Sequence, residues 1–509
     1  MRKLFTIFFC TFLLSANLFS LHNPPKREMR GVWIATVANI DWPSRQGLSV
    51  ERQKAEMIRI LDEFYRNNIN TVVFQIRPNA DALFDSPHEP WSAWLTGQQG
   101  RAPEPFFDPL QFVIDEARKR FMTVHVWLNP YRVNRANLVA RMHPDHLFFR
   151  QPELFVRYGN QYYFNPGLDE TRAFLNKIVR DIVERYDIDA IHLDDYFYPY
   201  PLRGHTFDDQ ATFEQFPRGF ESHQKHEWRR NNVNMIIAEL QETIKSVKPW
   251  VEFGISPFGI WRNRSSDPRG SDTRGGIENY DDLFADILKW LREGSIDYVV
   301  PQLYWNIGYD RACYATLVRW WAENAYGQNL YIGLGVYKMG DRNQPKAWNT
   351  GNEIVRQLEY NAKIPGVDGV MFFNTSHFLS NRFGLNDSLQ TNFFRYPALV
   401  PINRNIAGLP AKTPQHFNIV QDEHNSILFW ERIEQPVGYE LAFYIVYAFA
   451  GSEVGDLNNP ANILMRTHSN FVNLSEFNLQ GEYTFVVTSV NRFWHESEPA
   501  ESITRIITN

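Results

Sequence analysis

The sequence is poor in cysteine, with only Cys10 and Cys313. Cys10 lies inside the N-terminal apolar run MRKLFTIFFCTFLLSANLFS, which opens with basic residues and closes with small and polar ones. This layout is typical of a secretory signal peptide, so we expect residues 1–20 to be removed and the protein to be exported to the periplasm, cell envelope or extracellular space. Because Cys10 is not at the end of the run, lipid attachment is not expected. Signal removal would leave one cysteine, which excludes an internal disulfide and leaves stability to a large hydrophobic core.

Surplus positive charge and further long apolar runs are also absent. The chain has 52 Lys and Arg against 58 Asp and Glu, a formal net charge of -6 at pH 7. A protein that neutralises a phosphate backbone needs a basic surplus, so nucleic acid is not an expected partner. After the N-terminal run no stretch is long and apolar enough to cross a bilayer, so no integral membrane segment is expected once the signal is removed.

Several catalytic and cofactor motifs are missing. The segments HPDH and HQKHE do not have the H-E-x-x-H spacing of a zinc site, so neither a metal nor a cofactor is expected. No G-x-S-x-G elbow for a serine hydrolase occurs. The turn after the first predicted strand reads TVANIDWPSRQG, which lacks the glycines of a dinucleotide-binding turn and disfavours an open doubly wound sheet.

Short apolar runs alternate with amphipathic segments between about residues 30 and 400, the pattern of repeated strand–helix units. Eight parallel units predict closure into a (β/α)8 TIM barrel over residues 27–400. The eight runs are Val32–Val37, Thr71–Arg77, Thr123–Asn129, Ala190–Tyr196, Val251–Phe258, Tyr298–Trp305, Leu330–Lys338 and Val370–Asn374.

After the predicted barrel the composition changes. Residues 401–414, PINRNIAGLPAKTP, are rich in Pro and Asn and predict a linker. Residues 415–509 contain strand-like runs separated by polar turns, which predicts a small all-β sandwich. Trp430 and the stretch YTFVVTSVNRFWHESEPA make this segment similar to a fibronectin type III module.

Catalytic groups of a (β/α)8 barrel lie at the carboxyl ends of its strands, and side-chain alternation selects among them. In the fourth predicted strand Ile191 and Leu193 should face the helices, so His192 and Asp194 should point inward, with Asp194 nearest the mouth. Asp194 is therefore the leading catalytic carboxylate and Asp195 its alternate. His192 is expected beneath them, either as a tuning group or as an ordinary buried histidine.

Glycoside hydrolysis is one reaction that a barrel carboxylate could serve, but it usually needs two carboxylates, and a second one is hard to find in this sequence. The seventh predicted strand ends in GLGVYKMG, without Asp or Glu. A substrate whose own N-acetyl group acts as nucleophile would remove the need for the second carboxylate. The remaining candidates lie in loops, and they are Asp41, Asp81, Asp85, Glu89, Asp267 and Asp272.

Six phrases resemble those of the glycosyl hydrolase-like 10 family over roughly residues 27–400: MRGVWIATVANIDWPS, VVFQIRPNADALFDSPHEPWSAWLTG, VHVWLNPYRVN, DAIHLDDYFYPYP, GISPFGIWRN and VPQLYWNIG. The resemblance implies an exported bacterial barrel that, for some members, hydrolyses peptidoglycan glycan strands. It also places the acid at Asp194 or Asp195.

Three grounds select the residues that are expected to bind substrate: the family resemblance, the alternation of side chains along the strands, and the high content of aromatic residues, which is 15% of the chain. Flat rings can stack on sugars, although an aromatic-rich core would give the same composition. The expected substrate-binding residues are Arg77, Asn79, Asp81, Trp91, Asn129, Tyr131, His192, Tyr196, Tyr198, Gln302, Tyr304, Trp305 and Asn374.

These observations predict a glycoside hydrolase that cleaves a polysaccharide of the bacterial envelope, most simply the N-acetylated glycan strands of peptidoglycan, with Asp194 as general acid. Arg77 is expected either to orient Asp194, to bind a substrate carboxylate such as the lactyl group of muramic acid, or to form a structural ion pair. One alternative is a glycan-binding protein that does not cut, and a weaker one is a polysaccharide deacetylase, which would need a metal site.

Overall fold

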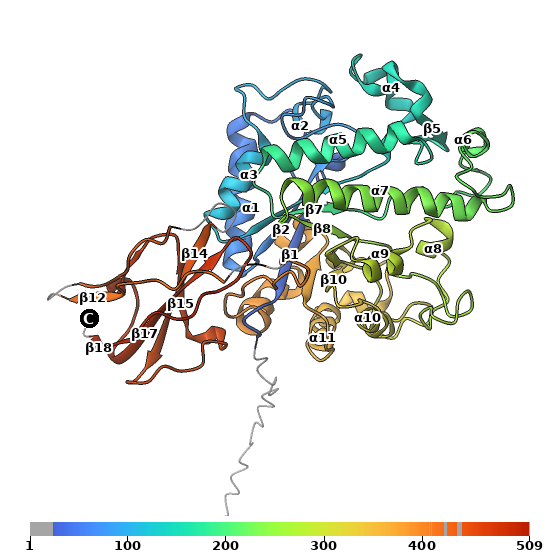
Figure 1. Cartoon of the computed structure of the whole chain (residues 1–509). Coiled ribbons are helices and arrows are strands. Elements are labelled where there is room, and N and C mark those ends of the chain that lie inside the picture. The colour runs from blue at the N-terminus through green and yellow to red at the C-terminus, as the bar shows by residue number, and fades with distance from the viewer. Residues whose placement is uncertain (1–23, 407, 409, 422–424, 435–439, 508–509) are drawn as a thin grey trace, which may run out of the picture.

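A computed structural model describes residues 24–406, 408, 410–421, 425–434 and 440–507. The predicted signal peptide, residues 1–20, lies outside the described residues. Figure 1 shows a barrel surrounded by helices, with antiparallel sheets beside it at the left. Among the described residues no helix has the length and apolar character needed to cross a membrane.

Eight parallel strands close the barrel, each paired with its two neighbours. This confirms the predicted fold class, and every predicted apolar run supplies one strand. In their order around the barrel the strands are β1 (Met29–Ile34), β2 (Thr71–Arg77), β3 (Thr123–Leu128), β7 (Ala190–Leu193), β8 (Glu252–Ile255), β9 (Tyr298–Val299), β10 (Asn329–Leu334) and β11 (Gly369–Phe372).

Several strands end earlier than the apolar runs that predict them. Strand β7 ends at Leu193, directly before Asp194 and Asp195. Strand β9 contains only Tyr298 and Val299, and Pro301, which has no N–H to donate to a ladder, follows within two residues. The remainders of these runs are therefore loop residues at the mouth of the barrel.

Helices cover the outside of the barrel (Figure 1). In α1 the N-cap Ser49 accepts a hydrogen bond from the Arg52 N–H, and the apolar face that includes Met57 and Phe64 is buried against the strands. The helices are α1 (Val50–Arg66), α2 (Ala93–Thr96), α3 (Pro109–Arg118), α4 (Leu147–Arg150), α5 (Asp169–Arg185), α6 (Gln210–Gln215), α7 (Lys225–Val247), α8 (Asn279–Asp282), α9 (Ile287–Glu293), α10 (Tyr314–Glu323), α11 (Asn352–Asn361), α12 (Thr375–Leu379) and α13 (Leu385–Ser388).

Side chains alternate along the strands as expected. Ile191 and Leu193 belong to the core between strands and helices. Ala190 belongs to a separate cluster inside the barrel, together with Trp127 and Tyr298. The alternation therefore directs His192 inward, where it is fully buried.

The antiparallel part of the chain forms two sheets that share one apolar core, which includes Trp430 and Tyr444. This is the predicted all-β sandwich, and its likeness to fibronectin type III stays a prediction. The two sheets are β12 (Asn418–Gln421), β13 (Ser426–Phe429) and β16 (Phe471–Asn473), and β15 (Ile463–Thr467), β14 (Leu441–Ala450), β17 (Gly481–Asn491) and β18 (Ile503–Ile507). A third small sheet lies between β3 and β7 in the chain: β4 (Arg132–Arg135), β6 (Gln161–Phe164) and β5 (Phe155–Tyr158).

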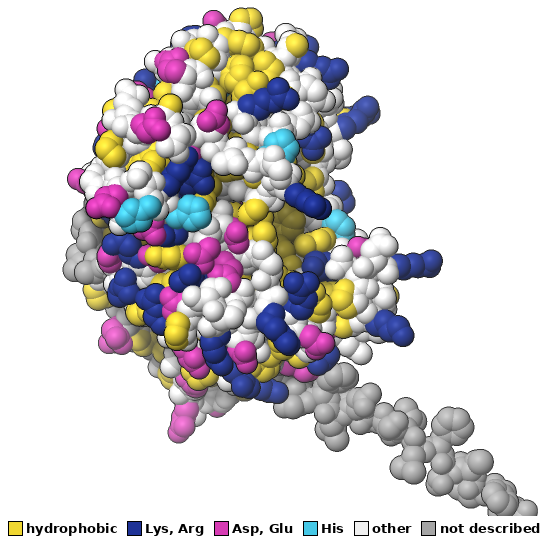
Figure 2. Space-filling view, turned by 90° about the vertical axis from the view of Figure 1, so that its right-hand side faces the viewer, with side chains coloured by type: hydrophobic (Ala, Val, Ile, Leu, Met, Phe, Trp, Pro, Cys, Tyr) yellow, Lys and Arg dark blue, Asp and Glu magenta, His cyan; other side chains and the backbone are white. Residues whose placement is uncertain are grey.

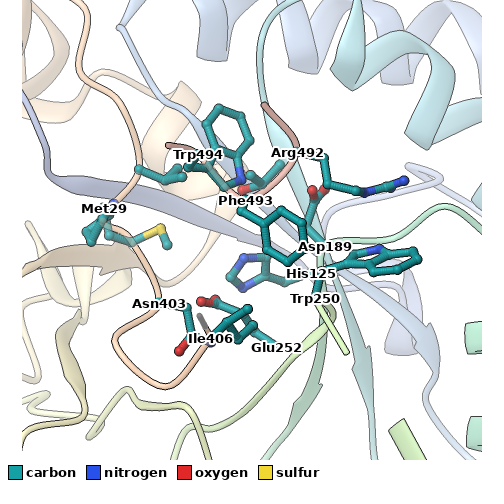
Figure 3. Close-up of a pocket in the computed structure, with 13 residues that line it drawn as sticks. Met29, His125, Asp189, Trp250, Glu252, Asn403, Ile406, Arg492, Phe493 and Trp494 are labelled. Carbon is teal, nitrogen blue, oxygen red and sulfur yellow. The ribbon is translucent and has the colours of Figure 1, made fainter. Parts of the chain in front are cut away.

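The sandwich closes the floor of the barrel, at the amino-terminal ends of its strands. Figure 3 shows Arg492, Phe493 and Trp494 from the sandwich facing His125, Glu252 and other barrel residues across a cavity of about 30 Å³. The Arg492 guanidinium pairs with the Asp187 carboxylate of the barrel. The catalytic end of a (β/α)8 barrel is the opposite one, so the sandwich leaves the mouth open.

Glu252 at this floor makes stability depend on pH. Burial and the nearby Asp297 raise the pKa of Glu252 to about 8. Its pKa in the unfolded chain is about 4.3, so its contribution to folding is complete below that pH and is lost as the pH rises towards 8. We expect Glu252→Gln, which mimics the protonated form, to show a flatter dependence of the free energy of unfolding on pH between about 5 and 8, measured by urea denaturation. Parallel curves for the two proteins would contradict a protonated Glu252.

Candidate active site

A pocket of about 470 Å³ opens at the carboxyl ends of the barrel strands. Figure 2 shows that the face opposite the sandwich is hollowed, with hydrophobic side chains in the recess and Lys and Arg side chains around it. The charged lining residues are Asp194, Arg132 and Lys338. The aromatic lining residues are Trp33, Trp127, Tyr196, Tyr200, Phe258, Tyr304, Trp305, Tyr337 and Phe373.

Asp194 is the one carboxylate among the described lining residues. It follows the last residue of β7 and retains 8% of its surface exposed. Its Oδ1 accepts the Asp195 backbone N–H at 2.8 Å and the Gln302 Nε2–H at 3.2 Å. Gln302 is itself held by the Ser256 carbonyl, to which its Nε2 donates at 2.9 Å. The carboxyl of Asp194 is therefore fixed at the pocket surface by groups from three neighbouring strand ends.

Asp195 lies beside Asp194 but is covered, with 3% of its surface exposed. The Tyr200 hydroxyl donates a hydrogen bond to Asp195 Oδ2. Burial raises the pKa of Asp194, and burial together with the adjacent Asp194 raises the pKa of Asp195 well above its usual range. Two buried carboxyls in contact cannot both ionise easily, so the pair favours a state in which one proton is shared between them.

His192 lies beneath the pocket in a buried hydrogen-bonded column. Its Nδ1 lies 3.0 Å from the Tyr298 hydroxyl and its Nε2 lies 3.0 Å from Ser256 Oγ. The Trp33 indole N–H, which can only donate, points at His192 Nε2 at 3.4 Å, so we assign the ring proton to Nδ1. Burial lowers the pKa of His192, which keeps the ring neutral. His192 therefore supports the floor of the pocket and does not line it.

The structure brings part of the predicted substrate-binding set together. Tyr196, Gln302, Tyr304 and Trp305 line the pocket with Asp194. The predicted residues that it places outside the lining are Arg77, Asn79, Asp81, Trp91, Asn129, Tyr131, His192, Tyr198 and Asn374, together with Asp195.

Of the three roles that the sequence allows for Arg77, the structure shows the structural ion pair. A register shift between Gln75 and Arg77 in β2 breaks the alternation, so Gln75 lines the pocket and Arg77 does not. The fully buried Arg77 guanidinium pairs with the Glu89 carboxylate at 2.6 Å and donates to the Asn129 carbonyl. Because the guanidinium is already paired, Arg77 is unsuited to bind a substrate carboxylate.

The loops after β2 and β3 hold four more predicted residues away from the pocket. Asp81 accepts the Asn79 backbone N–H at 3.3 Å, and burial raises its pKa to about 6. The Asn129 Nδ2 donates to the Pro78 carbonyl at 3.0 Å. Trp91 packs edge to face on Phe106, with ring centroids 6.2 Å apart. These residues shape the two loops.

Three further predicted residues also make their contacts outside the pocket: Tyr131, Tyr198 and Asn374. Tyr131 is completely buried, and Tyr198 packs against Phe284 with ring centroids 5.0 Å apart. The Asn374 Nδ2 donates to Asp41 Oδ1 at 2.9 Å, which joins the ends of β11 and β1. Neither alternation nor the resemblance could exclude these residues, because loops have no fixed side-chain period.

None of the six loop candidates for a second carboxylate lines the pocket. Asp41 accepts hydrogen bonds from Asn374 and from the Ala35 N–H, and burial raises its pKa to about 6. Asp81 and Glu89 are held as described above. Asp267 pairs with arginines, and Asp85 and Asp272 are exposed. Among the described residues no group of three or more His, Cys, Asp or Glu side chains could hold a metal ion.

Among the lining residues that the sequence did not select are Tyr200, Arg132 and Lys338. Tyr200 follows the paired aspartates in the same phrase as Tyr196 and Tyr198, but the loop gives no rule for choosing among three tyrosines. Arg132 stands in the phrase VHVWLNPYRVN, next to the selected Tyr131. Lys338 ends the seventh apolar run, a position at which a glycosidase is expected to have a carboxylate and not a cation.

A family model described as glycosyl hydrolase-like 10 matches residues 28–350. The chain is 40% identical to glycosyl hydrolase YngK of Bacillus subtilis over 99% of this chain and 98% of that protein. It is 38% identical to glycosyl hydrolase DigH of Escherichia coli K12 over 69% of this chain and 84% of that protein. The glycoside hydrolase domain of PgaB from Bordetella bronchiseptica aligns with 72% of this chain and 99% of that domain, at 13% identity and a TM-score of 0.49.

Proposed function

The chain belongs to the glycosyl hydrolase-like 10 family and is a glycoside hydrolase, and from this premise we propose that it cleaves the N-acetylated glycan strands of bacterial peptidoglycan. The observation that carries the proposal is the aromatic pocket at the barrel mouth with Asp194 as its one carboxylate among the described lining residues. Rings such as Trp305 and Tyr304 offer flat apolar faces to sugar rings. Export, proposed from the predicted signal peptide, would bring the enzyme to this polymer.

Asp194 acts as the general acid in this proposal. Its Oδ1 accepts two N–H groups, which suits the carbonyl oxygen of a protonated carboxyl and leaves Oδ2 to carry the proton. Burial raises the pKa of Asp194, which favours the protonated form that a general acid needs. Asp194 gives this proton to the glycosidic oxygen as the bond to the anomeric carbon breaks.

The substrate supplies the nucleophile. The described lining residues include no second carboxylate that could act as nucleophile. Instead, the acetamido oxygen of the sugar attacks the anomeric carbon of the same sugar, and water later opens the ring that this attack forms. An N-acetylated glycan provides this group on the sugar being cleaved. The scheme explains how one pocket carboxylate is enough, and Asp195 is the alternate acid.

The proposal is tested by incubating the mature chain, residues 21–509, with peptidoglycan sacculi, intact and stripped of stem peptides. We expect soluble glycan fragments with new reducing ends, identified by mass spectrometry. Release of acetate with uncut glycan would instead indicate a deacetylase. Glycan that is recovered bound but full length, or left entirely unbound, would reject peptidoglycan as the substrate.

A further inference from the structure

The described lining residues of the pocket include more cations than anions. Two cations, Arg132 and Lys338, share the lining with the single carboxylate Asp194. Arg132 follows β3 and Lys338 follows β10, strands that are separated by three others in either direction around the barrel. The two cations therefore stand on opposite walls of the mouth.

Arg132 is held in place without an acidic partner. Its Nε and Nη2 donate to the Pro78 carbonyl at 3.3 Å each, and its guanidinium lies 4.8 Å from the centroid of the Tyr196 ring. Among the described residues no carboxylate lies within 4.0 Å of the guanidinium. A guanidinium that is oriented but not neutralised is suited to a planar, bidentate anion such as a carboxylate.

Lys338 is arranged similarly on the other wall. Its Nζ donates to the Tyr304 carbonyl at 2.5 Å, and two further N–H donors remain on the ammonium. No carboxylate of the described residues lies within ion-pair distance of Nζ. The carbonyl fixes the position of the cation and does not cancel its charge.

From this arrangement we infer that the substrate is an anionic glycan, whose ring-borne carboxylate groups are bound by Arg132 and Lys338 while its sugar faces lie on the aromatic rings. The inference rests on the proposed function and adds to it a charged recognition element. A strand that crosses the mouth would meet one cation on each side of the cleavage point. Because the substrate is proposed to be peptidoglycan, the expected carboxylate is that of the lactyl group of muramic acid, which is free where the stem peptide has been removed.

Charge balance at Asp194 supports the same conclusion. The Arg132 charge acts to lower the pKa of Asp194, which opposes its use as an acid. A substrate carboxylate bound to Arg132 would neutralise this effect and favour the protonated Asp194. Anion binding and proton retention are thus coupled through one arginine.

The test measures binding separately from cleavage. The full mature chain carrying Asp194→Asn is titrated by calorimetry with three β-linked oligosaccharides: neutral chito-oligosaccharide, alternating N-acetylglucosamine and N-acetylmuramic acid with free lactyl groups, and hyaluronan fragments that carry uronate. Each titration is repeated with Arg132→Gln and Arg132→Lys added, and at about 0.05 and 0.5 M salt. Methyl esterification of the muramic acid oligosaccharide supplies a ligand of the same shape without charge.

The lactyl-bearing oligosaccharide is expected to bind at least about tenfold more tightly than its ester and than chito-oligosaccharide, with an advantage that shrinks in high salt. Arg132→Gln should remove most of this advantage and Arg132→Lys should retain part of it, where the advantage in each variant is the ratio of its affinities for the charged oligosaccharide and for the methyl ester. Tightest binding of hyaluronan would keep the carboxylate site but move its source to a uronate. Equal binding of charged and neutral ligands would overturn the inference and leave the glycan proposal standing, whereas no binding of any ligand would reject both.

Discussion

Replacing Asp194 with asparagine is expected to lower kcat on the glycan by about 10²- to 10⁴-fold, the usual contribution of a general acid. The asparagine Oδ1 can still accept the Asp195 and Gln302 N–H groups that hold Asp194 Oδ1, so the fold and the pocket should persist. What is lost is the transferable proton. The rate is measured as new reducing ends per enzyme, with folding checked by circular dichroism.

A leaving group that needs no protonation separates an acid from a structural residue. On an aryl N-acetylglucosaminide with a nitrophenol leaving group, Asp194→Asn should lose much less activity than on the glycan, because nitrophenolate departs without a proton. Asp272→Asn, an exposed carboxylate after β8, is the matched control and should behave as the parent protein. Equal losses on both substrates would contradict an acid role, and a loss confined to Asp195→Asn would move that role to the neighbour.

The fold was predictable because it depends on repeated patterns. Eight apolar runs each supply a barrel strand, and the alternation of Ile191 and Leu193 with His192 follows from backbone geometry alone. Asp194 was found by the same rule, since it is one residue beyond the regular strand β7. The rule succeeds as far as the ladder of hydrogen bonds extends.

The rest of the pocket depends on features that break the pattern. The register shift in β2 turns Arg77 away from the pocket, and no residue type in that strand predicts this shift. After β7 the chain is irregular, so nothing in YFYPYP shows that Tyr200 reaches Asp195 while Tyr198 packs against Phe284. Loop side chains are positioned by tertiary contacts, which a single sequence does not display.

Removing the Tyr200 hydroxyl is expected to shift the pH profile of the enzyme. The phenol donates to Asp195 Oδ2 and stays protonated, since burial and the two aspartates raise its own pKa. A donor at Asp195 favours the ionised form of that carboxyl and opposes the rise in its pKa, which shifts the shared proton towards Asp194. In Tyr200→Phe the pKa of Asp195 rises further, and Asp195 holds the shared proton more strongly. The bell-shaped profile of kcat/KM should therefore shift to higher pH, with a maximum lower by about tenfold or more.

The control for this prediction lies two residues earlier in the same loop. Tyr198 is a buried tyrosine outside the pocket, so Tyr198→Phe removes a hydroxyl without touching the aspartate pair and should leave the pH optimum in place. A Tyr200→Phe enzyme that is slower at an unchanged optimum would mean that Tyr200 shapes the pocket only. A shift to lower pH would mean that the hydroxyl normally stabilises a protonated Asp195, and the reacting proton would then belong to Asp195. The direction of the shift therefore decides which of the two carboxyls delivers the proton.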